Sequence, residues 1–143
     1  MSAVDWEPRL LAFVCNWAYY TPSERAQVDQ VAENGRDQVV RVPCSGRVSP
    51  FLLLNALQQG FDAILLVGCE AESCHYRDGS RLAQRRLRTL CQFLEYLGVE
   101  QGRIHLYWRS PLPDRPFNTL AAEAKAAARD LGPATVLVQT GER

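Results

Sequence analysis

The chain has 143 residues, of which 47% are hydrophobic and 22% are charged, so it is long enough to fold as one domain with its own core. Its 16 basic and 16 acidic residues balance, which argues against nucleic acid or anionic lipid as the main partner. We expect a single domain over residues 1–143, with its core at about residues 10–131 and a C-terminal tail at residues 132–143.

The N-terminal residues differ from a signal peptide. Residues 1–9 contain acids and a proline where a signal peptide would carry basic and then apolar residues. No run in the chain approaches the roughly 20 apolar residues of a membrane span. We therefore expect a cytoplasmic protein without membrane insertion. In that reducing compartment, five cysteines are better suited to metal binding or catalysis than to disulfides.

The chain alternates apolar runs with helical patterns. The first half predicts a strand, a weakly amphipathic helix after a capping threonine, a second strand, and a helix that begins at a proline and ends at a glycine. In order, these elements and their markers are residues 10–14, Thr21 to about residue 35, residues 39–43, and Pro50 to Gly60.

The second half continues this alternation. Residues 61–67 are the most apolar run and predict a strand buried on both faces. A long helix at about residues 80–97, a strand at residues 104–108 and a helix at residues 117–131 follow, and residues 135–138 predict a short fifth strand or an arm that lies on a partner. The fold class is therefore α/β, a three-layer sandwich with a small, mostly parallel sheet of four to five strands, flavodoxin-like or Rossmann-like.

Cysteines follow three of the predicted strands. Cys15 and Cys44 end the first two apolar runs, while Cys69 and Cys74 leave the central strand after Gly68. Because parallel strands end at one edge of a sheet, these four thiols are expected to converge where open α/β sheets place ligands. Four soft ligands at one point suit an iron-sulfur cluster or zinc.

The long helix carries two further patterns. Leucines recur along one side together with Cys91, which we therefore interpret as a core residue. Arg81, Arg85 and Arg88 recur along another side, directly behind the cysteine loop. This stripe predicts either a docking face for an acidic partner or a solvated helix face.

Several motifs agree in order and spacing with a known family. They are Asn16-Trp17 directly after Cys15, the run Cys44-Ser45-Gly46-Arg47-Val48, and Gly68-Cys69-x4-Cys74-His75-Tyr76 followed by Ala83 and Arg85-Arg86. From about Leu10 to Leu131, the chain resembles the delta-subunit family of methyl-viologen-reducing hydrogenase.

The resemblance implies a small iron-sulfur subunit that binds a 2Fe-2S cluster. Such a subunit relays electrons between a hydrogenase or formate dehydrogenase module and a heterodisulfide-reductase-like flavoprotein. The family usually has a second cysteine after the Asn-Trp pair, where this chain has Ala18. Four cysteines remain, and we expect Cys15, Cys44, Cys69 and Cys74 to be the metal ligands.

Other residues near these cysteines are candidates for holding or tuning the cluster. Ser45, Gly46 and Gly68 can bring backbone N–H groups close to sulfur, while Arg47 and His75, with Arg77, are candidate compensating charges. Trp17 and Trp108 lie at strand ends and can shield the site from water, although core packing is the simpler interpretation of Trp108.

The cysteines have three other conceivable uses. Zinc fits four thiols, but structural zinc sites usually draw ligands from close pairs. A nucleophilic thiol lacks a phosphate-binding loop or a facing base. A cluster-free docking subunit stays possible because of Ala18. The chain shows no substrate-pocket motif, so we expect no substrate site of its own.

Overall fold

The sheet is small and entirely parallel. The computed structural model describes residues 6–19, 21–70, 78–109 and 115–138. Within these ranges, four strands form one sheet in the order β2-β1-β3-β4. They are Leu10–Cys15 (β1), Gln38–Val42 (β2), Ala63–Cys69 (β3) and Ile104–Arg109 (β4). This is the order of the first four strands in a flavodoxin-like fold.

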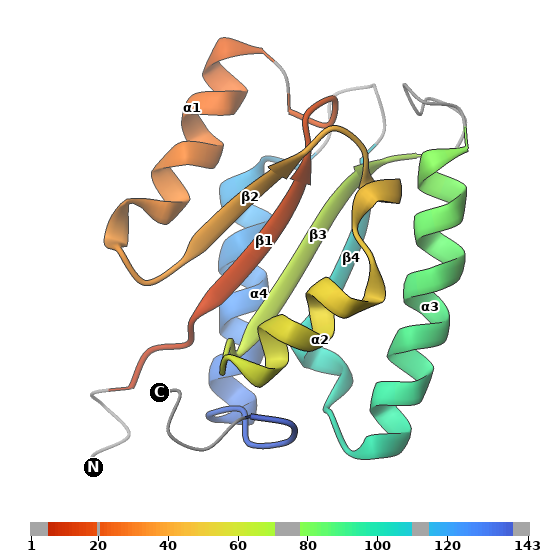
Figure 1. Ribbon diagram of the computed structural model, residues 1–143. Helices are drawn as coiled ribbons and strands as arrows, with labels where there is room; N and C mark the ends of the chain where they lie inside the picture. Colours follow the sequence, from red (N-terminus) through yellow and green to blue (C-terminus); the bar gives the residue numbers. More distant parts are fainter. Residues whose placement is uncertain (1–5, 20, 71–77, 110–114, 139–143) are drawn as a thin grey trace.

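Helices cover both faces of the sheet. The helices are Pro22–Val31 (α1), Pro50–Gln58 (α2), Gly79–Leu97 (α3) and Phe117–Leu131 (α4). Residues of α1 and α4 pack into one apolar cluster with the sheet, and residues of α2 and α3 pack into a second. The two clusters make the three-layer α/β fold predicted from the sequence (Figure 1).

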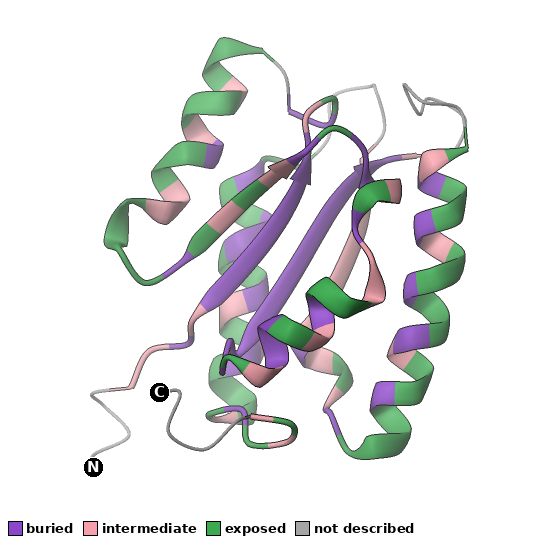
Figure 2. Ribbon diagram, in the orientation of Figure 1, coloured by how far each residue is buried: buried purple, intermediate pink, exposed green. Residues whose placement is uncertain are grey.

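The two central strands are buried along their whole length. Every residue of β1 and β3 is buried, which explains why their sequences are continuous apolar runs rather than alternating patterns (Figure 2). Each fully buried leucine or valine in these runs contributes about 1.5–3 kcal/mol to folding. The carboxyl ends of the strands lie at the top of Figure 1, and the predicted site lies at that edge.

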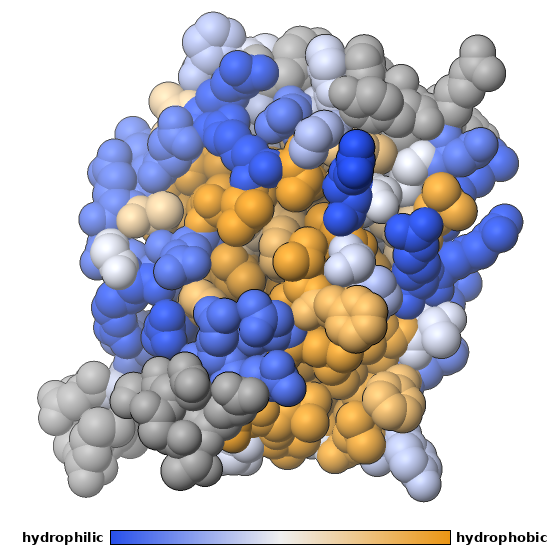
Figure 3. All heavy atoms as spheres, viewed as in Figure 1, coloured by the Kyte–Doolittle hydropathy of each residue, from blue (hydrophilic) through white to orange (hydrophobic). Residues whose placement is uncertain are grey.

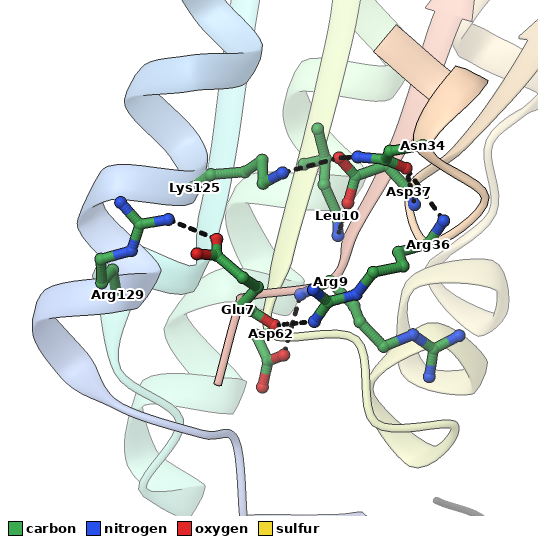
Figure 4. Close-up of polar contacts among 9 residues, drawn as sticks. All are labelled: Glu7, Arg9, Leu10, Asn34, Arg36, Asp37, Asp62, Lys125 and Arg129. Atoms are coloured by element: carbon green, nitrogen blue, oxygen red, sulfur yellow. Dashed lines mark hydrogen bonds and ion pairs between the residues drawn. The ribbon is translucent and has the colours of Figure 1, made fainter. Parts of the chain in front are cut away.

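The opposite edge is held by two buried carboxylates. Asp62 accepts hydrogen bonds from the backbone N–H groups of Arg9 at 2.9 Å and Ala134 at 2.8 Å. Asp37 accepts one from the N–H of Leu10 at 3.0 Å and pairs with Lys125 at 2.8 Å (Figure 4). These bonds fix the start of β1, at the end of the sheet opposite the predicted site.

The tail differs from the prediction. Residues 135–138 do not form a fifth strand: Val136 and Leu137 lie in a turn closed by a hydrogen bond from the N–H of Val138 to the carbonyl of Thr135 at 3.3 Å. The alternative, an arm that lies on a partner, stays a prediction. Asp62 holds the preceding Ala134, and Val136 packs against the α2/α3 cluster. Residues 135–138 therefore form a turn rather than a strand.

Some apolar positions that fit helical spacing lie on the surface. Phe51 of α2 is 79% exposed, because Leu53, Ala56 and Leu57 supply the buried side of this short helix. Figure 3, viewed from the α2 side, shows apolar atoms over the middle of this face. In α3, Leu82 and Leu97 are also exposed, since the buried side there is narrower than the predicted stripe.

None of the helices in the described ranges is long and apolar enough to cross a membrane. The longest, α3, has 19 residues, but one side of it is lined with arginines. A bilayer core needs about 20 predominantly apolar residues in a row.

Candidate functional site

Two of the predicted thiols meet at the carboxyl edge of the sheet. Cys15 ends β1 and Cys69 ends β3, and the parallel register that pairs Val14 with Val67 carries both strand ends to the same level. The sulfur atoms lie 3.8 Å apart, and the two residues are only 3% and 6% exposed. Two thiol side chains thus share one buried position.

The thiol of Cys15 lies in a polar environment despite its burial. Its hydrogen bond with the Cys69 side chain lowers its pKa most strongly. Burial acts in the opposite direction, and the backbone N–H groups of Trp17, Ser45 and Ala18 lower the pKa further, to about 6. A thiol in this environment is readily held as the thiolate, which is the form that binds metal.

Cys44 lies in the neighbouring loop. It follows β2 and begins the short 3-10 helix Ser45–Arg47 (η3), where its sulfur accepts a hydrogen bond from the N–H of Gly46 at 3.4 Å. The carbonyl oxygen of the preceding residue, Pro43, lies 3.9 Å from the sulfur of Cys15. The loop of the second predicted ligand thus contacts the first predicted ligand.

The two predicted glycines are sites of close backbone approach. A Cβ at Gly46 would lie 2.9 Å from the Cα of Gly79, at the start of α3. A Cβ at Gly68 would lie 2.7 Å from the ring of Trp108 and 2.9 Å from the hydroxyl of Ser45. Both positions therefore exclude side chains and keep the loops packed against the strand ends.

Ser45 brings an unsatisfied hydroxyl into this packing. The residue is fully buried, and its Oγ has no hydrogen-bond partner among the described residues. A buried hydroxyl without a partner costs about 1–3 kcal/mol. Because Ser45 begins η3 and its hydroxyl lies beside Gly68, it is a candidate donor to an acceptor bound at this edge.

Arg47 lies on the open side of the η3 loop. It is exposed and lines a surface pocket of about 540 Å³ together with Pro43, Cys44, Gly46, Asp78, Gly79 and Leu82. Its charge therefore faces solvent beside Cys44, which is compatible with the predicted compensating role. Cys74, His75 and Arg77 lie outside the described residues.

The four-cysteine ligand set stays a prediction. Within the described ranges, no cluster of three or more cysteine, histidine or acidic side chains is close enough to hold a metal ion. The structure brings Cys15 and Cys69 together and places Cys44 on the adjacent loop. The fourth predicted ligand, Cys74, belongs to the segment at residues 71–77 that is not described.

The two tryptophans differ in their surroundings. Trp17 is 41% exposed, so it covers the loop after Cys15 only in part. Trp108 is half-buried and packs against the α2/α3 cluster and the backbone of Gly68. Core packing, the simpler interpretation of Trp108, therefore agrees with the structure.

Cys91 lies far along α3 from the thiol edge. It is 12 positions after Gly79, or about 18 Å along the helix at 1.5 Å per residue. Its side chain is half-buried, and burial raises the pKa of its thiol. Cys91 therefore keeps its proton at neutral pH and lies apart from the thiol edge. It belongs to neither core cluster and lines a surface pocket, so its interpretation as a core residue was wrong.

Arg109, which ends β4 beside Cys69, is a residue of this edge that the sequence motifs did not reveal. The sheet register pairs Arg109 directly with Cys69. The guanidinium donates to the carbonyl oxygen of Ala18 at 2.5 Å, forms an ion pair with Glu24 at 2.7 Å and lies 4.3 Å from the ring centre of Tyr19. A cation at the carboxyl end of a strand next to a cysteine-terminated strand was the signal that could have identified it.

The pKa of Glu24 reflects this contact. Burial alone would raise the pKa of its carboxyl group, but hydrogen bonds from Thr21 and the charge of Arg109 outweigh burial and lower it. The carboxylate is therefore ionised at neutral pH and holds Arg109 from the α1 side.

Ser80 makes a separate link, because its hydroxyl donates to the carbonyl of Cys69 and joins α3 to the end of β3.

Comparison with known proteins identifies a matching family and several related hydrogenase subunits. Residues 10–132 match the family described as methyl-viologen-reducing hydrogenase, delta subunit. An iron-sulfur subunit of the F420-non-reducing hydrogenase of Archaeoglobus profundus is 37% identical over 129 residues, which cover 90% of this chain and 94% of that protein. The iron-sulfur subunit of the vhc F420-non-reducing hydrogenase of Methanococcus voltae is 32% identical over 98% of this chain and 97% of that protein.

A longer protein contains a related segment. One subunit of the ferredoxin:CoB-CoM heterodisulfide reductase of Methanosarcina mazei is 29% identical over 126 residues. The match covers 88% of this chain but only 16% of the reductase subunit. A unit of this kind therefore occurs both as a short chain and as a segment of a larger reductase subunit.

Proposed function

Because the chain belongs to the family of methyl-viologen-reducing hydrogenase delta subunits, we propose that it is an iron-sulfur electron-transfer subunit. The observation that carries this proposal is the contact between the sulfur atoms of Cys15 and Cys69 at the carboxyl edge of the sheet. The names of the two hydrogenase relatives, which both describe iron-sulfur subunits, support it.

The residues at this edge fit a 2Fe-2S cluster. Such a cluster takes four thiolates, and Cys15, Cys44, Cys69 and Cys74 would supply them. The unsatisfied hydroxyl of Ser45 and the N–H groups that point at Cys15 are donors suited to sulfur that carries negative charge. When bound, the cluster accepts and releases one electron, while the protein sets its potential and excludes water.

The relatives support a hydrogenase and a heterodisulfide reductase among the proposed partners. The subunit would take electrons from a hydrogenase or formate dehydrogenase module and pass them to a heterodisulfide-reductase-like flavoprotein, or the reverse. The segment related to this chain within a heterodisulfide reductase protein supports the second partner, because covalent linkage there keeps the two parts together. A cytoplasmic location remains an expectation from the sequence.

A cluster-free docking subunit is the alternative, and Ala18 is the observation that favours it. Ala18 occupies the position of the expected second cysteine, is 3% exposed and packs in the same cluster as Cys15 and Cys69. If the missing thiol were an essential ligand, the chain would keep its interfaces and lose its redox role. The iron content of the purified protein separates the two functions.

The test is metal analysis of protein purified without oxygen. We expect about two iron atoms and two acid-labile sulfides per chain, with a coloured protein and an electron paramagnetic resonance signal that appears on reduction. Cys69→Ser and Cys15→Ser should each lose or strongly perturb that signal. Cys91→Ser is the matched control, since it removes a thiol outside the site and should leave the spectrum unchanged. A folded wild-type protein that stays colourless after anaerobic reconstitution would favour the docking function.

A further inference from the structure

Arg109 makes an unusual set of contacts for a strand-end arginine. Its side chain is only 14% exposed, and its guanidinium reaches across the end of the sheet to the loop that follows Cys15. It donates to the carbonyl oxygen of Ala18, a link across 91 positions of sequence. A buried cation needs partners for its charge, and the two terminal nitrogens of Arg109 have them, while its buried Nε has no hydrogen-bond partner among the described residues.

The contacts are divided between three residues on one segment of chain. Ala18 supplies a carbonyl oxygen, Tyr19 an aromatic ring at 4.3 Å, and Glu24, at the start of α1, a carboxylate at 2.7 Å. Tyr19 is in turn held by Phe117, with ring centres 5.7 Å apart, and is fully buried. The loop after Cys15 is therefore held from β4 in addition to its own turn, in which the N–H of Ala18 donates to the carbonyl of Cys15.

The same loop contains backbone N–H groups that face the thiol edge. The N–H of Ala18 donates to the carbonyl of Cys15 at 3.0 Å, and the N–H groups of Trp17 and Ala18 also interact with the sulfur of Cys15. Their direction depends on the peptide orientation at residues 16–19. The hydrogen bond from Arg109 to the Ala18 carbonyl fixes the next peptide plane of this loop.

We propose that Arg109 is a positioning residue, which holds the backbone of residues 16–19 in the shape that directs its N–H groups at the sulfur of Cys15. The side chain acts through the loop and not by contact with a bound group. Its direct pairing with Cys69 in the sheet means that the residue that orients the loop is anchored to the strand that carries the other thiol. This inference deepens the proposed function and relies on it only for the electrochemical measurement below.

Arginine is required for this role because one planar group serves three partners. The guanidinium donates in two directions while its face stacks on the Tyr19 ring. A lysine at this position keeps the charge but offers a single ammonium group, so it can serve the carboxylate or the carbonyl with less geometric control. A glutamine keeps one amide donor and loses the charge.

The first measurement uses the metal-free protein. Amide hydrogen exchange of Ala18 is followed by NMR in the wild type, Arg109→Gln and Arg109→Lys, with Arg129→Gln as control because Arg129 pairs with Glu7 at the other edge of the sheet (Figure 4). We expect the Ala18 amide, which donates to the carbonyl of Cys15, to exchange roughly tenfold or more faster in Arg109→Gln, because the loop that keeps this bond in place would lose its hydrogen bond to a charged group. Arg109→Lys should be intermediate, and Arg129→Gln should match the wild type.

The second measurement uses the iron-loaded protein. N–H groups that point at sulfur favour the reduced, more negative state, so their loss should make the midpoint potential of Arg109→Gln more negative than that of the wild type. Arg109→Lys should recover part of the shift, and Arg129→Gln should show none. Loss of the positive charge alone would also make the potential more negative, but Arg109→Lys would then recover the shift in full rather than in part.

Opposite results would overturn the inference. Ala18 exchange in Arg109→Gln within about twofold of the wild type would show that Arg109 does not hold the loop, because a lost charged hydrogen bond implies a larger change. If Arg109→Gln fails to fold, Arg109→Lys decides, because wild-type exchange in that variant would contradict a role for the guanidinium geometry. If the wild type binds no iron, the proposed function fails, while the exchange measurement still tests the positioning role.

Discussion

The sulfur atoms of Cys15 and Cys69 lie 3.8 Å apart although 54 positions of sequence separate the two residues. Their contact follows from the parallel pairing of β1 with β3, which runs in register from Leu10 and Ala63 to Val14 and Val67. A slip of one residue would turn the side chains of one strand to its other face, into the opposite core cluster. The buried apolar runs that fix the register therefore also set the thiol contact.

Cys15 and Cys91 should differ in the pH at which they react. The pKa of Cys15 is lowered from 9.0 to about 6, so its thiolate forms as the pH rises through about 6, whereas burial raises the pKa of Cys91. In metal-free protein, alkylation of Cys15 by iodoacetamide should reach its plateau near neutral pH, while that of Cys91 should still rise above about pH 9. Peptide mass spectrometry resolves the two sites. Identical pH profiles would contradict the assignment.

Ala18→Cys should be silent in iron content and spectrum. If Cys15, Cys44, Cys69 and Cys74 are the four ligands, the new thiol has no coordination position to fill. Ala18 is buried in the core cluster, so the added atom should cost some stability for steric reasons. Ala18→Ser is the matched control, because it adds a similar atom that binds iron poorly. More iron in Ala18→Cys than in Ala18→Ser would show that the four-ligand assignment is wrong.

Gly68→Ala should destabilise the protein through the site's own packing. The added methyl group would lie 2.7 Å from the ring of Trp108 and 2.9 Å from the hydroxyl of Ser45. Overpacking of this kind costs about 1–3 kcal/mol of unfolding free energy, measurable by urea denaturation. Gly68→Ala should cost less unfolding free energy in a Trp108→Leu background than in the wild type, because the smaller leucine leaves room for the added methyl group. Additive costs in the double variant would show that the two positions do not clash.

The arginine stripe on α3 should contribute to partner binding. Arg81, Arg85 and Arg88 are all exposed, line shallow hollows on one side of the helix and are available to an acidic partner. Changing all three to glutamate should weaken co-purification with the proposed flavoprotein partner, and the effect should be stronger at low salt. The circular dichroism of the isolated protein should stay unchanged. The same change at Arg25, Arg36 and Arg129 matches the charge difference on other surfaces. Equal co-purification of both variants would mean that the stripe is a solvated face.

The secondary structure could be predicted because its signals are local. The apolar run at residues 61–67 was long enough to indicate a strand buried on both faces, and Thr21 with Pro22 marked the start of α1 through a capping box that the structure contains. One of the two interpretations of the tail, a strand at residues 135–138, was wrong, because Asp62 and the α2/α3 cluster hold this part of the chain in a turn. That interaction joins residues distant in sequence, so no local pattern reveals it.

By itself, the sequence determined the succession of strands and helices along the chain, the parallel α/β class and the cysteines that end the strands. These features depend on periodicity and on residues adjacent in the chain. Only the tertiary structure decided that Cys15 and Cys69 are in contact, that Gly68 makes room for Trp108, and that Arg109 reaches the loop after Cys15. Each of these depends on the register of neighbouring strands and on the direction of side chains at their ends. Those quantities are set by packing between elements far apart in the chain, which is why spacing along the sequence could not supply them.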